Sequence, residues 1–310
     1  MTEISQKILK HYQVRKSKKQ KDTFIDFLQS NFPELTVETY KGSRSKNLIL
    51  GDPVRAKILV SAHYDTCAWM PVPNFITPLN PLLTVIYSIA LLIPIFMIEF
   101  ILNLILSLMA APYLVLFIFS LILLYAMLGL MILGPANTHT ANDNTSGVIG
   151  LCELYQSLTA EQRKNVCIIF FDNEEKGLLG SGTYRKKHKK AIKNQLLINL
   201  DCISDGDHFL LAITKKARNS YLSEIKESFQ NNGSKTILLK KAEYVYYPSD
   251  QAGFPLSIAI AALKHKKLIG YYMDRIHTNR DTIMDERNIE LLQTSICNLI
   301  HAITIECADC

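Results

Sequence analysis

Charge is missing from the middle of this sequence. Between Pro81 and Leu133 the only charged residue is Glu99, whereas the rest of the chain has the composition of a charged, soluble protein. The uncharged block contains two apolar segments, residues 82–110 and 113–133, and each is long enough to cross ~30 Å of hydrocarbon as a helix. A soluble core of this size would not hold about fifty residues with one charge, so we expect both segments to lie in a membrane.

The residues on the two sides of the uncharged block are expected to form one folded unit. Both flanks must then lie on the same side of the membrane, which requires an even number of crossings. We therefore expect a two-helix transmembrane hairpin over residues 80–135, inserted into a discontinuous domain made of residues 1–79 and 136–310. A homodimer formed through the hairpin is one arrangement that this prediction leaves open.

We expect no signal peptide, because the N-terminal residues include neither an apolar core nor a cleavage site with small residues. Basic runs at residues 15–21 and 184–193 favour a cytoplasmic position for the flanks of the hairpin. The same charges could hold the domain against anionic lipid, although each run alone is equally typical of a solvated helix face. We expect an integral membrane protein whose folded domain faces the cytoplasm, with the lipid bilayer as a partner and no nucleic acid among its partners.

Paired cysteines are missing as well. The chain has seven cysteines, an odd number, and most of them lie in apolar runs. Buried thiols are therefore expected rather than disulfides. The last two, Cys307 and Cys310, have metal-ligand spacing but no second pair to complete a site.

The chain does contain metal-binding residue types at the ends of its expected strands, none of them cysteine. In chain order they are His63 and Asp65, Asp143 before an amphipathic helix, the pair Glu174 and Glu175, Asp201, and His277 beside a turn. In open α/β sheets, ligands gather beyond the carboxyl ends of the strands, so these side chains could converge. Zinc accepts imidazole and carboxylate ligands. Each histidine alone is more often structural, and an isolated acidic pair is usually a solvated loop, so the inference depends on the whole set.

Five motifs in this order resemble those of the co-catalytic dizinc aminopeptidases, relatives of bacterial leucyl aminopeptidases and glutamate carboxypeptidases. The motifs are SAHYDT (61–66), ANDNTSGV (141–148), DNEEKGLLGS (172–181), NLDCIS (199–204) and HTNRDT (277–282). The resemblance covers roughly residues 5–70 and 137–305, which is all but the uncharged block. It implies a single α/β domain with a mixed, mostly parallel central sheet flanked by helices.

The resemblance also implies a pair of Zn²⁺ ions. His63 and Asp201 would bind one ion, Glu175 and His277 would bind the other, and Asp143 would bridge both. The two ions bring four positive charges and the three carboxylates bring three negative ones, which leaves room for one bridging hydroxide. Paired metals would lower the pKa of that water and polarise a carbonyl group.

Two further carboxylates receive roles from the same resemblance. Glu174 would be the general base, which takes the proton of the water and passes it to the leaving amine. Asp65, two residues past His63 and on the same strand face, would orient the imidazole. The remaining candidates lie in a segment expected near the substrate cleft: Tyr244, Tyr246, Tyr247, Asp250 and Gln251.

Two features depart from the family pattern. Asp143 follows His63 by 80 positions, and removing residues 82–133 shortens this separation to 28. The hairpin is therefore expected to be inserted in a loop beside the site. Gln251 stands where the family usually has histidine, which bears on substrate specificity more than on metal binding.

The activity that the resemblance implies is hydrolysis of a peptide substrate, with removal of its N-terminal residue by a membrane-anchored zinc aminopeptidase. Two alternatives remain. Glutaminyl cyclases share the fold with one working zinc, and a non-catalytic receptor or scaffold could be built on the same domain. The full set of ligands and the presence of Glu174 favour the hydrolase over both.

Overall fold

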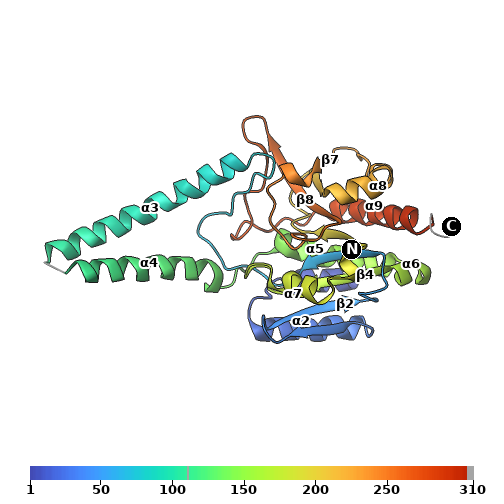
Figure 1. The fold of residues 1–310 in the computed structure, drawn as a ribbon, viewed down its shortest axis with the longest axis horizontal. Helices are drawn as coiled ribbons and strands as arrows, with labels where there is room; N and C mark the ends of the chain where they lie inside the picture. The colour runs from blue at the N-terminus through green and yellow to red at the C-terminus, as the bar shows by residue number, and fades with distance from the viewer. Residues whose placement is uncertain (110–111, 306–310) are drawn as a thin grey trace.

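The computed structural model of the protein describes residues 1–109 and 112–305, and a mixed sheet forms its centre (Figure 1). Within these residues nine strands lie in the order β1-β2-β4-β3-β5-β8-β6-β7, with β9 paired to β8. The strands are β1 (Thr36–Tyr40), β2 (Ser45–Leu50), β3 (Ile58–His63), β4 (Val166–Phe171), β5 (Leu196–Leu200), β6 (His208–Ile213), β7 (Thr236–Lys241), β8 (Ser257–Lys266) and β9 (Gly270–Tyr272). Strands β3, β4 and β5 are apolar and buried along their whole length, as is typical when both faces of a sheet are covered.

The four central strands, β4, β3, β5 and β8, are parallel to one another. Strand β2 joins antiparallel to β4 on one side, and β6 joins antiparallel to β8 on the other. The predicted mixed sheet is confirmed, with its parallel pairing concentrated at the centre. Because parallel strands end at the same edge, the loops after β3, β4 and β5 meet there.

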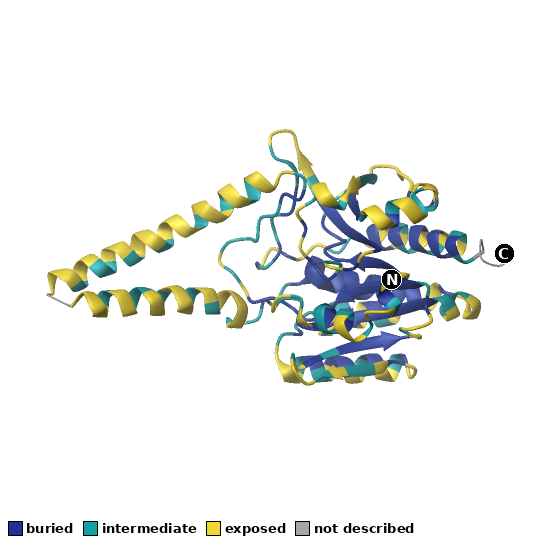
Figure 2. Ribbon diagram, viewed as in Figure 1, coloured by how far each residue is buried: buried dark blue, intermediate teal, exposed yellow. Residues whose placement is uncertain are grey.

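Helices cover both faces of the sheet. Outside the uncharged block they are α1 (Glu3–His11), α2 (Lys18–Asn31), α5 (Gly147–Ser157), α6 (Ala160–Asn165), α7 (Leu179–Lys187), α8 (Lys215–Ser228) and α9 (Glu286–Ile305), with short helical segments η1 (Ala141–Ser146), η2 (Ala191–Lys193) and η3 (Ala242–Tyr244). Helices α1, α2, α5 and α9 contribute to one large apolar core. On the other face, Tyr184 of α7 packs against Phe171 in a smaller core. Figure 2 shows this buried interior in dark blue.

Two helices in the uncharged block project away from the rest of the molecule (Figures 1 and 2). Helices α3 (Pro81–Leu108) and α4 (Tyr113–Leu133) have mean hydropathies of 2.6 and 2.7 and contain no buried residues. By length and composition alone, both could cross a membrane. A hydrogen bond of 2.9 Å from Asn103 Nδ2 to Ser120 Oγ links them. Polar contacts of this kind hold helices together in a membrane.

The chain that leads into this hairpin pairs with the chain that leaves it. The Trp69 N–H group donates to the main-chain oxygen of Pro135 at 2.8 Å. The segment before α3 also lies along the loop after β9, where the Met70 N–H group donates to the main-chain oxygen of His277 at 2.8 Å. The base of the hairpin is therefore attached directly to the loop that carries His277.

The cysteines of the described residues are all free thiols, as predicted. Cys67, Cys152, Cys167 and Cys202 are buried, and Cys297 is half-buried. Cys307 and Cys310 lie outside the described residues.

Candidate metal centre

The five predicted ligands converge at the carboxyl edge of the central strands. His63 ends β3, Glu175 follows β4, Asp201 follows β5, Asp143 lies in η1 and His277 lies in the loop after β9. His63, Asp143 and Asp201 are buried, and the other two are half-buried. The parallel centre of the sheet thus gathers side chains that are up to 214 positions apart in the sequence.

Asp143 stands between the two histidines. Its Oδ1 lies 3.4 Å from His63 Nε2, and its Oδ2 lies 3.2 Å from His277 Nε2. Asp201 Oδ1 lies 3.6 Å from His63 Nε2, and Glu175 Oε2 lies 3.6 Å from His277 Nε2. Two donors bonded to one tetrahedral zinc at ~2.0–2.1 Å are ~3.3–3.4 Å apart. The observed spacings therefore suit two neighbouring ions that share Asp143.

One oxygen of this set has no partner among the described residues. Glu175 Oε1 is buried and accepts no hydrogen bond, which is costly for a carboxylate. Donor atoms of Asp143, Glu175, His277 and Cys67 all lie within 4.8 Å of one another. Nitrogen, oxygen and sulfur donors at this spacing fit zinc.

Cys67 is an addition to the predicted donors. The sequence has no cysteine at a matching strand end, and Cys67 lies four residues past the end of β3, where the chain returns toward the site. Burial and the nearby Glu175 raise the pKa of its thiol well above the ordinary value. The thiol therefore stays protonated unless a cation is close to it.

Asp65 does more than contact the imidazole of His63. Because β3 ends at His63, the predicted position of Asp65 on the strand face is wrong, and Asp65 lies in the loop beyond. His63 Nδ1 is 3.0 Å from the main-chain oxygen of Asp65 and 3.7 Å from its Oδ1. The carboxylate also accepts the N–H groups of Glu174 (2.9 Å) and Glu175 (3.3 Å). Asp65 thus joins the loop after β3 to the turn that presents both glutamates.

Asp281 is a site residue that sequence reasoning missed. Its carboxylate is buried and accepts the N–H groups of Asn142 (2.7 Å) and Asp143 (3.0 Å). It therefore fixes the main chain at the ligand that faces both histidines. Its place in the motif HTNRDT, four residues after His277, is the signal that could have identified it.

Arg15 begins the basic run at residues 15–21, but it does not lie on a solvated helix face. Arg15 is fully buried, and its guanidinium donates to the main-chain oxygen of Tyr64 and to Thr145 Oγ1. Burial lowers its pKa to about 10, although Asp65 and Asp143 raise it. The guanidinium therefore stays charged at neutral pH and offsets part of the negative charge of the site.

Carboxylates crowd the site, and their pKa values rise accordingly. Burial raises the pKa of Glu174 well above its usual range. The nearby His63 opposes this rise, and the nearby Glu175 adds to it. Burial raises the pKa of Glu175 to about 7, offset in part by His277. Burial would lower the pKa of His277, but Glu175 and Asp143 raise it to about 9. Divalent ions bound here would lower the carboxylate pKa values again.

The cleft candidates differ in their exposure. Tyr244 and Tyr246 are 76% and 52% exposed. Tyr247 is buried, and its hydroxyl donates to the main-chain oxygen of Asp201 at 3.2 Å. Tyr247 therefore supports a candidate ligand from behind, while the other two tyrosines face solvent.

Asp250 and Gln251 are turned toward the interior. Gln251 Oε1 accepts a hydrogen bond from Asn199 Nδ2 at 3.0 Å, and its Nε2 donates to the main-chain oxygen of Tyr247 at 2.7 Å. Asp250 is fully buried, and burial raises its pKa to about 7. The position where the family usually has histidine is thus occupied by an amide that links β5 to this segment.

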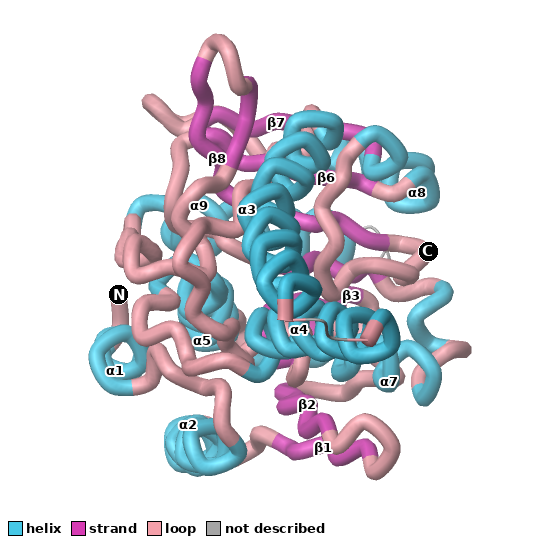
Figure 3. The backbone as a smooth tube through the Cα atoms, turned by 90° about the vertical axis from the view of Figure 1, so that its left-hand side faces the viewer, coloured by secondary structure: helices cyan, strands magenta, loops and turns pink. Residues whose placement is uncertain are grey.

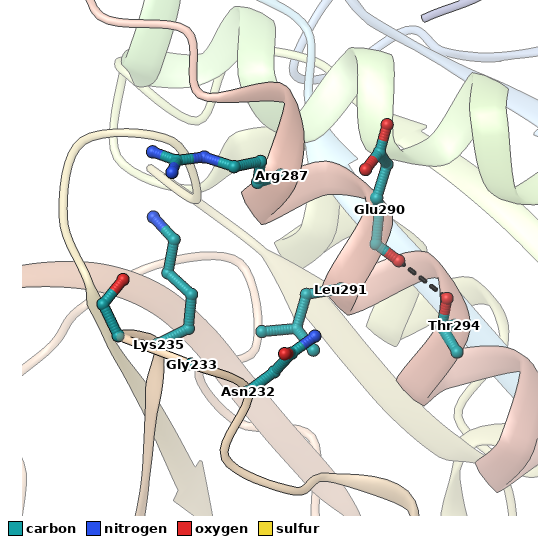
Figure 4. Close-up of a pocket in the computed structure, with 8 residues that line it drawn as sticks. Asn232, Gly233, Lys235, Arg287, Glu290, Leu291 and Thr294 are labelled. Carbon is teal, nitrogen blue, oxygen red and sulfur yellow. Dashed lines mark hydrogen bonds between the residues drawn. The ribbon is translucent and has the colours of Figure 1, made fainter.

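The hollow in Figure 4 lies elsewhere and contains none of the candidate ligands. Its volume is about 570 Å³, and residues 232–235 and the first part of α9 form it. Lys235 pairs with Asp207 and with Asp285, both at 2.7 Å, and Arg287 pairs with Asp285 at 2.9 Å. Its cations are therefore neutralised by neighbouring carboxylates.

A family model described as peptidase family M28 matches residues 127–300, a range that contains every candidate ligand except His63 and Cys67. The fold is similar to a glutaminyl cyclase from Porphyromonas gingivalis (TM-score 0.60, 15% identity, 96% of this chain and 96% of that chain). It is also similar to a Zn-dependent exopeptidase from Parabacteroides distasonis (TM-score 0.57, 14% identity, 96% of this chain and 94% of that chain). A third similar structure is the LapA aminopeptidase of Legionella pneumophila (TM-score 0.54, 12% identity, 96% of this chain and 68% of that chain). At these identities the likeness shows a shared fold. No curated protein matches the sequence.

We expect Asp143→Ala to lower the occupancy of both zinc sites together, because each of its oxygens faces a different histidine. His63→Ala and His277→Ala should each weaken mainly one site. Elemental analysis of the purified variants, compared with the unaltered protein, measures this. An Asp143→Ala protein that retains two tightly bound zinc ions would contradict a shared ligand.

Metal-free protein is expected to lose stability as the pH rises from about 4.5 to about 7. Glu175 has an ordinary pKa of 4.5 and a folded pKa of about 7, so in this window the folded state binds more protons than the unfolded state. The stability that protonated Glu175 contributes is therefore fully present below pH 4.5 and is lost as the pH rises through about 7. Zinc needs the deprotonated carboxylate, so zinc should reverse the trend.

Thermal unfolding of chelator-treated and zinc-loaded samples across this pH range tests the expectation. Glu175→Gln is the matched control, and it should reduce the slope in the metal-free sample, while Asp250, whose pKa burial also raises to about 7, retains part of it. A metal-free melting temperature that rises throughout the window would show that burial of Glu175 does not control it.

Proposed function

Because this chain belongs to peptidase family M28, we propose that it is a membrane-anchored, zinc-dependent aminopeptidase. The observation that carries the proposal is the position of Asp143 between His63 and His277, with a donor set on each side. The proposed ligands of the two Zn²⁺ ions are His63, Asp143, Glu175, Asp201 and His277.

When bound, the two ions would polarise the scissile carbonyl and lower the pKa of an attacking water. The chain itself contributes Glu174, whose main-chain N–H is held by Asp65 while its side chain remains half-buried. Burial raises the pKa of Glu174 above its usual range, which favours a carboxyl group that can both take a proton and return it to a leaving amine. Glu174 is therefore the proposed general base, and its neighbour Glu175 is a proposed ligand.

Removal of an N-terminal residue is the favoured form of this activity. Two of the similar solved structures are described as an aminopeptidase and as a Zn-dependent exopeptidase. Glutaminyl cyclisation is the second candidate, since the cyclase structure matches this chain over nearly the whole length of both. Zinc stoichiometry separates the candidates: two ions support the hydrolase, one supports the cyclase and none supports a non-catalytic scaffold.

We further propose that α3 and α4 anchor the protein in a bilayer as an insertion, residues 80–135, in the domain formed by residues 1–79 and 136–310. The apolar surface of both helices supports insertion into a bilayer. The basic runs of the flanks support a cytoplasmic position for the domain. Because the base of the hairpin is attached to the His277 loop, the active site would open close to the lipid surface. Hydrophobic or membrane-associated peptides would then reach it by diffusion in the plane of the membrane.

Glu174→Gln should leave the zinc content unchanged and reduce kcat by roughly 10²–10⁴-fold, the range for loss of a general base. The assay is release of the N-terminal residue from unblocked peptides, with N-acetylated versions of the same peptides as uncleaved controls. Glu175→Gln is the matched variant and should lose metal. Loss of metal from Glu174→Gln instead would show that the roles of the two glutamates are reversed.

Replacing residues 80–134 by a short Gly/Ser linker should give a soluble protein, since residues 68–69 already pair with residues 135–136 outside the replaced segment. Activity on small soluble peptides should persist, whereas turnover of hydrophobic or membrane-associated peptides should fall. Fractionation and paired peptide assays measure both effects. Cleavage of the C-terminus by a protease added outside intact cells would contradict the proposed topology.

A further inference from the structure

A hollow of about 590 Å³ lies between the start of α2, the β1–β2 turn and the turn after β4. Seven of its lining residues are lysine or arginine and two are acidic. This basic hollow is distinct from the candidate metal centre, since none of the five proposed zinc ligands lines it. We propose that it binds the phosphate-bearing headgroup of an anionic phospholipid.

Both acids of the basic hollow are already neutralised. Lys21 Nζ lies 2.5 Å from Asp172 Oδ1, and Lys46 Nζ lies 2.6 Å from Asp22 Oδ1. The other five cations form no ion pair with any residue that the structure describes; they are Lys16, Lys18, Lys41, Arg44 and Lys176. The hollow in Figure 4 differs in this respect, because its cations are paired with carboxylates. An uncompensated cluster of this kind favours an anionic ligand.

Three separate parts of the chain supply these cations, so the basic hollow is not the solvated face of a single helix. Lys16 and Lys18 lie at the start of α2, on either side of its N-cap residue. Lys41 and Arg44 lie in the β1–β2 turn, and Lys176 lies in the turn after β4. Lys21 is buried and also donates to Asn173 Oδ1 at 2.8 Å. Together with its pairing to Asp172, this contact fixes α2 against the turn after β4.

Lys16 connects the basic hollow to the hairpin. Its ammonium donates to the main-chain oxygen of Ile132 in the last turn of α4, where a positive charge complements the free carbonyl groups. Figure 3, which views the molecule from the hairpin side, shows α2 end-on below α4 with β1 and β2 beside it. The inference rests on the proposed insertion of α3 and α4, because the end of α4 then lies at the level of the lipid headgroups.

This position favours a lipid over a soluble phosphate as the source of the ligand. Anionic headgroups are present at high local density beside the base of the hairpin, and their attraction for basic residues extends about one Debye length, ~8–10 Å. Lys18, Lys41 and Arg44 are exposed. A headgroup can therefore reach them without displacing the two ion pairs in the floor.

The full-length protein, purified in a neutral detergent, is titrated with phosphatidylglycerol or with phosphatidylcholine, and bound lipid is measured by native mass spectrometry. We expect phosphatidylglycerol to bind at least about tenfold more tightly. The triple variant Lys18→Gln, Lys41→Gln and Arg44→Gln should weaken phosphatidylglycerol binding by about 10- to 100-fold, with zinc content and cleavage of soluble peptides unchanged.

The matched control removes three exposed cations from the other basic run, as Lys186→Gln, Lys189→Gln and Lys190→Gln. This variant should keep the preference for phosphatidylglycerol. Equal weakening in both triple variants, or unchanged binding in the first, would overturn the proposal. Inorganic phosphate that displaces phosphatidylglycerol at comparable concentration would also overturn it, in favour of a soluble ligand.

Failure of the proposed function would be seen in different measurements. Release of the protein from membranes by alkaline carbonate would refute insertion of the hairpin. Absence of zinc or of peptide cleavage in the unaltered protein would refute the peptidase. Neither result is read from the lipid titration, so failure of the proposed function is distinguishable from failure of the headgroup site.

Discussion

Buried negative charge around Asp143 is the constraint on which the rest of this structure depends. Carboxylates from the loops after β3, β4, β5 and β9 meet in a small volume, and two imidazoles and Arg15 offset only part of their charge. Burying such groups without compensation is expensive, so they must either bind protons or face a cation. The raised pKa of Glu175 is the first solution and bound metal is the second. Folding, protonation and metal binding are therefore coupled at this site.

The topology of the sheet places the hairpin beside that charge. Insertions are tolerated in loops at the edge of a sheet, where they leave the core intact, and the loop after β3 opens at the same edge as the candidate ligands. The chain before the hairpin pairs with the chain after it through Trp69 and Pro135, and residues 70–76 bind the loop after β9 through main-chain hydrogen bonds. The segment that leads into α3 is thus joined to the loop of a candidate ligand by several main-chain hydrogen bonds.

Much of this arrangement could be predicted from the sequence, because its signals are local. Apolar runs that end in His63, Glu175 and Asp201 mark strand ends, and a parallel sheet brings strand ends together. The hairpin followed from the near absence of charge over residues 82–133, where Glu99 is the only charged residue. These predictions needed only the order of elements, and they did not need the path of the loops between them.

The residues that escaped prediction depend on tertiary contacts. Arg15 belongs to a run whose composition is typical of a solvated surface, and only the packing of α1 and α2 buries it. Cys67 reaches the site because the loop after β3 turns back, and no local pattern encodes that turn. Asp281 was visible within a motif, but its contacts are to the main chain of residues 142–143, more than a hundred positions away.

The basic run at residues 15–21 shows how one short segment can connect the metal centre to a membrane. Arg15 donates to the main-chain oxygen of Tyr64 just after β3, and Lys16 binds the end of α4. Lys18 faces the basic hollow, and Lys21 pairs with Asp172. Because Arg15 and Lys21 are buried, the segment between them has little freedom to move. With α4 in a bilayer, the distance from the leaflet to the candidate ligands is then set by packed side chains rather than by a flexible linker. The orientation of the active site toward the membrane would be a property of the fold itself.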